Sequence, residues 1–235
     1  MRHLAFLVVG LFAFSASAEF VEIKLSDGAD IDAHLYKPSG KGPYPGVIVL
    51  HHSVGLTDSI KDFSYDLRGK DFVTLAVDFD TKGGWLDSKV VTAYDYLQKL
   101  PMVDPRRIGI VGFSQGARLG MEMAIFFKNE YPLRPFRAFV SYYVGNSLRL
   151  MPTPELPPIL FLHGGHDTGV AADVIVTFCG MQKDLGGPCE AKIYGGTQHA
   201  FIRKKSSHYD RTATVDAFKR TVTFLNKHLR NAPIQ

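Results

Sequence analysis

The chain has 235 residues, of which 46% are hydrophobic and 21% charged, and its formal net charge is +4 at pH 7. This composition is ordinary for a globular protein, and the length suits one α/β domain. The positive balance is mild. Because its only basic cluster is Arg203-Lys204-Lys205, the charge pattern argues against a nucleic-acid-binding protein.

The first 18 residues have the pattern of a secretory signal peptide. The basic start Met1-Arg2-His3 precedes an apolar run over 4–14, and Ala16-Ser17-Ala18 matches an A-x-A cleavage site. The run is shorter than the about 20 residues of a membrane-spanning helix. We expect a periplasmic or secreted protein, with residues 19–235 as one domain and no membrane association after cleavage. The alternative is an uncleaved anchor.

The remaining chain is expected to fold as a hairpin followed by alternating strands and helices. Alternating polarity around Asp27-Gly28 predicts the hairpin. Mostly apolar runs predict the strands of a buried parallel sheet. The expected strands are 20–25, 31–37, 46–50, 72–77, 107–111, 136–142, 159–163 and 190–194. The expected helices are 59–70, 88–100, 115–128, 170–185 and 209–229. This order predicts the α/β class, with a mostly parallel twisted sheet of about eight strands flanked by helices.

The segment Gly112-Phe113-Ser114-Gln115-Gly116 lies between an expected strand and an expected helix. A G-x-S-x-G pattern in this position is typical of the nucleophile elbow of α/β-hydrolases. The serine occupies a sharp turn, and side chains two positions away on either side would collide with neighbouring backbone. The pattern therefore predicts that Ser114 is a nucleophile.

An acid and a base are expected to follow the serine in chain order. Asp167 and His199 each follow a short strand and a glycine turn, so both are expected at the carboxyl edge of the sheet. His199 would accept the proton of Ser114, and Asp167 would orient the imidazole. Asp78 and Asp80 are alternative acids, but they precede the serine.

Two backbone N–H groups are expected to stabilise an oxyanion. Gln115 directly follows the nucleophile and supplies the first. The second is expected from Ser53, in the loop His51-His52-Ser53-Val54-Gly55-Leu56 that follows the third strand.

These motifs resemble the dienelactone hydrolase family of α/β-hydrolases. That family has H-E-x-x-G-L after the third strand, G-[YF]-C-x-G-G at the elbow, G-x-x-D for the acid and G-x-H-x-F-x-x-R around the histidine. The matching segments are residues 51–56, 112–116, 164–167 and 196–203. Two positions differ, because Ser114 replaces the family's cysteine and His52 replaces its glutamate. A serine has to rely on His199 for activation, so simple esters become better candidates than dienelactone.

The resemblance also implies substrate-binding residues. In the family, basic residues near two places hold the substrate carboxylate. Arg203 matches one of these residue by residue, and Lys82 matches the other by loop position. His52 and the single tryptophan, Trp85, are further candidates, and Trp85, Tyr142 and Tyr143 could line an acyl pocket or belong to the core.

Cys179 and Cys189 form an even pair on either side of a glycine-proline turn, which predicts a disulfide in an exported protein. The pair His51-His52 and the segment His163 to Asp167 lack the companions of a metal site. We expect no metal and no cofactor.

The expected function is an exported serine hydrolase acting on small-molecule esters or lactones through an acyl-enzyme, as a monomer or homodimer. The alternatives are a polysaccharide deacetylase, a thioesterase or an acyl-peptide hydrolase on the same fold. A binding protein without turnover is a further alternative, because fold does not determine function.

Overall fold

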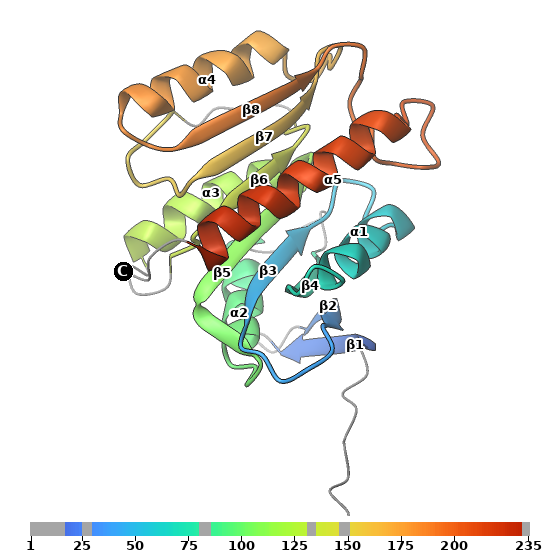
Figure 1. Cartoon of the computed structure of the whole chain (residues 1–235), viewed down its shortest axis with the longest axis vertical. Coiled ribbons are helices and arrows are strands. Elements are labelled where there is room, and N and C mark those ends of the chain that lie inside the picture. The colour runs from blue at the N-terminus through green and yellow to red at the C-terminus, as the bar shows by residue number, and fades with distance from the viewer. Residues whose placement is uncertain (1–16, 25–29, 80–85, 131–134, 146–150, 232–235) are drawn as a thin grey trace, which may run out of the picture.

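A single eight-stranded sheet runs through the protein (Figure 1). The computed structural model describes residues 17–24, 30–79, 86–130, 135–145 and 151–231. The strand order is β1-β2-β4-β3-β5-β6-β7-β8; β2 pairs antiparallel with β1 and β4, and every other pair is parallel. The strands are β1 (Ser17–Lys24), β2 (Asp30–Lys37), β3 (Tyr44–Leu50), β4 (Val73–Asp78), β5 (Val103–Phe113), β6 (Phe139–Tyr142), β7 (Ile159–Gly164) and β8 (Cys189–Tyr194).

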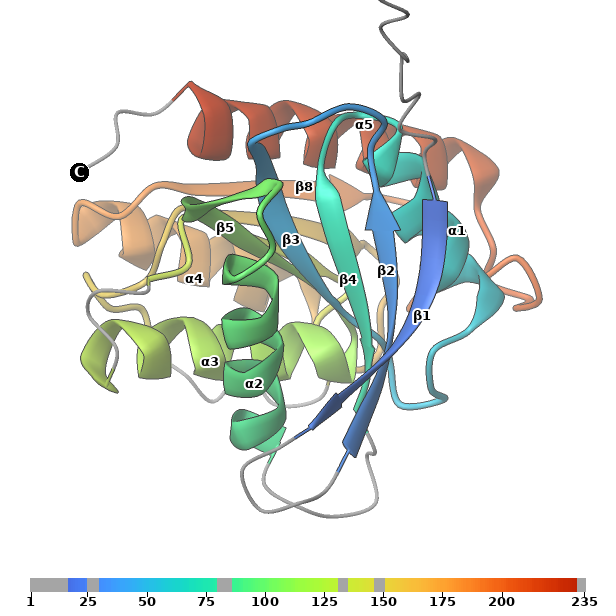
Figure 2. The same ribbon diagram turned by 90° about the horizontal axis from the view of Figure 1, so that it is seen from below.

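Helices cover both faces of this sheet, so its central strands are apolar on both sides. Figure 2 shows α1 and α5 on one face, and α2, α3 and α4 on the other. Along β3, alternate side chains enter two separate cores: Ile48 and Leu50 one, Val47 and Val49 the other. The helices are α1 (Asp58–Arg68), α2 (Leu86–Gln98), α3 (Gln115–Glu130), α4 (Ala172–Asp184) and α5 (Arg211–Leu225). The structure confirms the predicted α/β class and the opening hairpin.

Some predicted boundaries were wrong. The strand expected at 136–142 begins only at Phe139, because burial of Phe136 and Ala138 alone does not make a strand. The helix expected at 209–229 begins after Asp210, whose carboxylate accepts a hydrogen bond from the Ala213 N–H. Its α-helical part ends at Leu225, and a π-helical turn, η1 (Asn226–Arg230), follows.

The parallel strands bring their carboxyl ends to one edge of the sheet. β5, β6, β7 and β8 are successive neighbours in the sheet. The loops that follow them therefore lie close together although they are far apart in the sequence. In α/β sheets this edge is where ligands bind.

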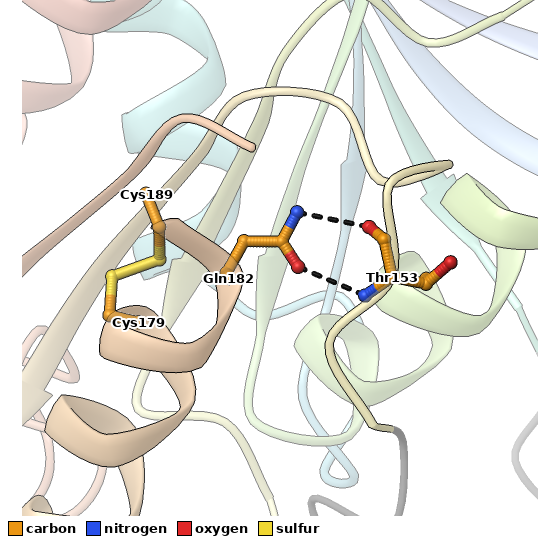
Figure 3. Close-up of a disulfide and its surroundings, with 4 residues drawn as sticks. All are labelled: Thr153, Cys179, Gln182 and Cys189. Carbon is orange, nitrogen blue, oxygen red and sulfur yellow. Dashed lines mark hydrogen bonds between the residues drawn. A yellow bond between two sulfur atoms is a disulfide. The ribbon is translucent and has the colours of Figure 1, made fainter. Parts of the chain in front are cut away.

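A disulfide and a buried glutamine hold α4 against its surroundings (Figure 3). The predicted disulfide is present and joins Cys179 on α4 to Cys189 at the start of β8. The side chain of Gln182 is fully buried. It accepts a hydrogen bond from the Thr153 N–H and donates one to the Thr153 carbonyl, both at 3.0 Å. The amide of Gln182 thus pairs with both backbone groups of one residue, as a residue of a neighbouring strand would. This pairing attaches the loop before β7 to α4.

We predict that Gln182→Ala lowers the free energy of unfolding by about 2–4 kcal/mol. The change leaves two buried backbone groups of Thr153 without partners and opens a cavity. In thermal unfolding, the Tm should fall by roughly 5–15 °C. The control is Lys183→Ala at the neighbouring exposed position. If the two variants had the same Tm, Gln182 would not hold this loop.

Candidate active site

Ser114 lies at the tip of a tight turn between β5 and α3. Its φ is +53°, a backbone conformation that residues other than glycine rarely adopt. The two elbow glycines permit the turn. A Cβ on Gly112 would lie 2.4 Å from the Gly116 carbonyl oxygen, and a Cβ on Gly116 would lie 2.4 Å from the Leu50 and His51 carbonyl oxygens. The expected collision with neighbouring backbone therefore holds at both positions.

Ser114, His199 and Asp167 form one chain of hydrogen bonds. The distance from Ser114 Oγ to His199 Nε2 is 2.8 Å, and that from His199 Nδ1 to Asp167 Oδ2 is 2.7 Å. Because an ionised carboxylate only accepts hydrogen bonds, His199 carries its proton on Nδ1. Nε2 is then the acceptor for the Ser114 hydroxyl. The arrangement can take a proton from the serine.

Burial and hydrogen bonding act in opposite directions on Asp167. Its side chain is 0% exposed, and burial alone would raise its pKa. The hydrogen bond from His199 and the Gly169 N–H at 2.8 Å outweigh burial and lower the pKa of Asp167 below its usual value. Asp167 therefore remains a carboxylate beside His199.

The loops that carry Asp167 and His199 are bonded directly to each other. The Gly165 N–H donates to the Tyr194 carbonyl at 2.8 Å, and the His166 N–H donates to the Thr197 carbonyl at 2.9 Å. A Cβ on Gly164 would lie 2.5 Å from the Thr197 carbonyl oxygen. This close backbone approach sets the positions of the carboxylate and the imidazole relative to each other.

A cavity of about 650 Å³ opens above Ser114. Both residues predicted to supply oxyanion donors, Ser53 and Gln115, line it. Its described lining consists of Ser53, Ser114, Gln115, Arg118, Gly145, Thr168, Gly169 and His199.

Gly145 was missed in the sequence analysis although it borders the reactive position. A Cβ there would lie 3.3 Å from Ser114 Oγ and 3.2 Å from the Gln115 nitrogen. Glycine thus keeps open the space where an oxyanion would form between these two groups. The available signal was its position three residues after a buried strand that neighbours the elbow strand.

The predicted substrate-binding residues occupy different surroundings. His52 is buried beside Thr57, and burial together with the positive charge of Arg203 lowers its pKa to about 4. Burial raises the pKa of the Tyr143 hydroxyl, and the positive charge of Arg203 acts in the opposite direction. Neither His52 nor Arg203 belongs to the described cavity lining. Lys82 and Trp85 lie outside the described residues. All four substrate-binding roles stay predictions.

The alternatives raised from the sequence also have definite positions. Asp78 lies 3.2 Å from His51 Nε2, whereas Asp167 contacts His199. Asp80 lies outside the described residues.

Tyr142 and Tyr143 are fully buried, and Tyr142 hydrogen-bonds Thr221 at 2.7 Å, so both belong to the core. Within the described ranges, no group of three or more His, Cys, Asp or Glu side chains is placed to hold a metal ion.

The chain is similar in sequence to one family of hydrolases. The model of the dienelactone hydrolase family matches residues 85–229, which is more than half of the chain. A protein assigned as a carboxymethylenebutenolidase in Saccharolobus solfataricus is 27% identical, and the match covers 86% of this chain and 96% of that protein.

Solved structures extend the likeness to the whole fold. One from Klebsiella pneumoniae, assigned as a dienelactone hydrolase, has a TM-score of 0.74 at 19% identity and covers 91% of this chain and 99% of its own. The thermophilic carboxylesterase EstE1, from a metagenomic library, has a TM-score of 0.75 at 19% identity, covering 91% and 90%. The chain belongs to the dienelactone hydrolase family and is a carboxylic ester hydrolase with the α/β-hydrolase fold.

Proposed function

We propose that this hydrolase is an exported enzyme that cleaves small esters or lactones through an acyl-enzyme formed on Ser114. The observation that supports this most strongly is the unbroken chain of hydrogen bonds from Ser114 through His199 to a buried carboxylate, Asp167. A hydroxyl is a weak nucleophile at its ordinary pKa, and an adjacent oriented base is what activates it.

The proposed reaction has two halves. His199 Nε2 takes the proton of Ser114 as Oγ attacks the ester carbonyl, and the backbone N–H groups of Gln115 and Ser53 stabilise the oxyanion. The intermediate then expels the alcohol, which leaves with the proton from His199, and the acyl group stays on Ser114. In the second half His199 deprotonates a water molecule, which attacks the acyl carbonyl. The bond from that carbon to Ser114 Oγ then breaks, His199 returns the proton to Oγ, and the acid is released.

The serine and His52 fit each other in this mechanism. Where the family has a glutamate beside a thiol, this chain has a histidine that burial keeps neutral at pH 7. The reacting hydroxyl is therefore not opposed by a second carboxylate at that position. A serine that His199 activates does not need a carboxylate beside it, so the neutral His52 agrees with a serine nucleophile. Both differences from the family favour simple esters as substrates.

We predict that Ser114→Ala lowers kcat/KM for short-chain p-nitrophenyl esters by about 1,000-fold or more, because the nucleophile is lost. A fluorophosphonate probe should label Ser114 in the parent, as read by peptide mass spectrometry. The exposed Ser207 supplies the control variant Ser207→Ala, which should retain both activity and labelling. A folded parent with neither turnover nor label would instead support a binding protein.

We predict that Asp167→Asn reduces kcat by roughly 1,000-fold or more with the fold retained. An amide would favour the wrong tautomer of His199 and would not stabilise its charged form. Asp78→Asn is the matched control, since Asp78 was the alternative acid and contacts His51 instead. Circular dichroism checks the fold. If Asp78→Asn were the more damaging change, the acid would be misassigned.

Export is part of the same proposal, supported by the leader pattern of residues 1–18 and by the disulfide. Residues 1–16 lie outside the described residues. In the part of the chain that the structure describes, every helix is too short or too polar to cross a membrane.

We predict that the full chain, expressed in a bacterium with a periplasm, is recovered there with Glu19 as its first residue. Intact mass and N-terminal sequencing measure this. Ala18→Arg should block processing, because the cleavage site needs a small residue at that position. Recovery of the unprocessed parent chain from the cytosolic fraction would contradict the export proposal.

A further inference from the structure

Arg118 lies on the wall of the cavity, one turn of α3 beyond Ser114. Its backbone N–H donates to the Ser114 carbonyl at 3.1 Å, and its side chain is 30% exposed. Ser114 directly precedes α3 and lines the same cavity as Arg118. The Arg118 side chain therefore borders the space above the reactive serine.

The cavity wall carries a positive charge at this point. Among its described lining residues, Arg118 is the one with a permanent charge. Asp167 is the acid of the hydrogen-bonded chain that starts at Ser114. Its side chain is 0% exposed and is hydrogen-bonded to His199, so it does not face a ligand. The N-terminus of α3 adds a partial positive charge on the same side.

Among the described residues, Arg118 pairs with one acid, Glu122, which lies outside the described lining. The two form an ion pair on α3 through Arg118 Nη1. A guanidinium has five N–H donors in a planar fork, so this contact leaves others for a ligand. Glu122 steadies the side chain and partly offsets its charge. An ion pair between residues four apart on a helix adds little to the stability of the helix. Helix stability alone therefore does not explain why an arginine lines the cavity.

We propose that Arg118 binds a carboxylate on the ester substrate and so gives the enzyme a preference for anionic esters over neutral ones. This inference rests on the proposed function and names its substrate class. Arg118 acts as a specificity-determining residue; the bond-breaking steps remain with Ser114 and His199.

Two matched substrate pairs test the proposal, one for each side of the ester. Monoethyl glutarate and ethyl pentanoate have acyl chains of the same length with and without a carboxylate. 4-Acetoxybenzoate and its methyl ester differ in the charge of the leaving group. The measured quantity is the ratio of kcat/KM for the anionic ester to that for its neutral partner, followed by NMR.

Arg118→Gln should lower this ratio by about 10- to 100-fold for at least one pair, as expected for loss of a hydrogen bond between charged groups. Arg118→Lys should restore part of it, and Glu122→Gln should raise it, because the competing carboxylate is gone. Added salt should reduce the parent's ratio and have little effect in Arg118→Gln.

The control is Arg220→Gln, which breaks an i,i+4 ion pair with Asp216 on α5, outside the described cavity lining. Its ratio should equal the parent's. If Arg118→Gln is folded and its ratio is unchanged for both pairs, the inference is overturned while the proposed function stands. If the folded parent hydrolyses none of the four esters, the proposed function fails and the inference fails with it.

Discussion

The site depends on how closely three pieces of backbone approach one another beneath Ser114. The end of β3, the end of β5 and the start of α3 meet where a single extra carbon on Gly112 or Gly116 would lie 2.4 Å from a carbonyl oxygen. This contact forces the turn and holds Ser114 at a φ of +53°. The surrounding sheet supports this conformation, and strain of this kind is characteristic of functional sites.

The rest of the site follows from the order of the strands. β6 and β7 separate the elbow strand from β8, so the loops after β7 and β8 reach the serine along the same edge of the sheet. Gly164 allows those two loops to touch, and their hydrogen bonds bring Asp167 and His199 together. The disulfide and Gln182 fasten α4, the helix that follows the Asp167 loop.

The sequence predicts a segment well where a single physical requirement, such as burial or a tight turn, decides which residues can occupy it. A fully buried parallel strand needs an apolar run, and a tight turn between a strand and a helix needs glycines. The sequence therefore predicts β3, β7 and the turn at Ser114 directly. Arg118 and Gly145 were missed because a surface arginine on a helix and a glycine in a loop have many ordinary explanations. Only the packed structure places both beside Ser114. The last helix was predicted to end at residue 229, and the chain is helical to Arg230, but the hydrogen-bonding pattern changes from α to π after Leu225, which the sequence did not indicate.

The mechanism proposed above requires a covalent acyl group on Ser114, which rapid acid quenching can trap. The parent is mixed with an excess of p-nitrophenyl acetate, quenched within the first turnovers and digested for peptide mass spectrometry. We expect an acetyl group on the peptide that contains Ser114, formed during a burst of nitrophenol equal in amount to the enzyme present. Steady turnover with no acetylated peptide, or with the acetyl group on another residue that turnover requires, would contradict it.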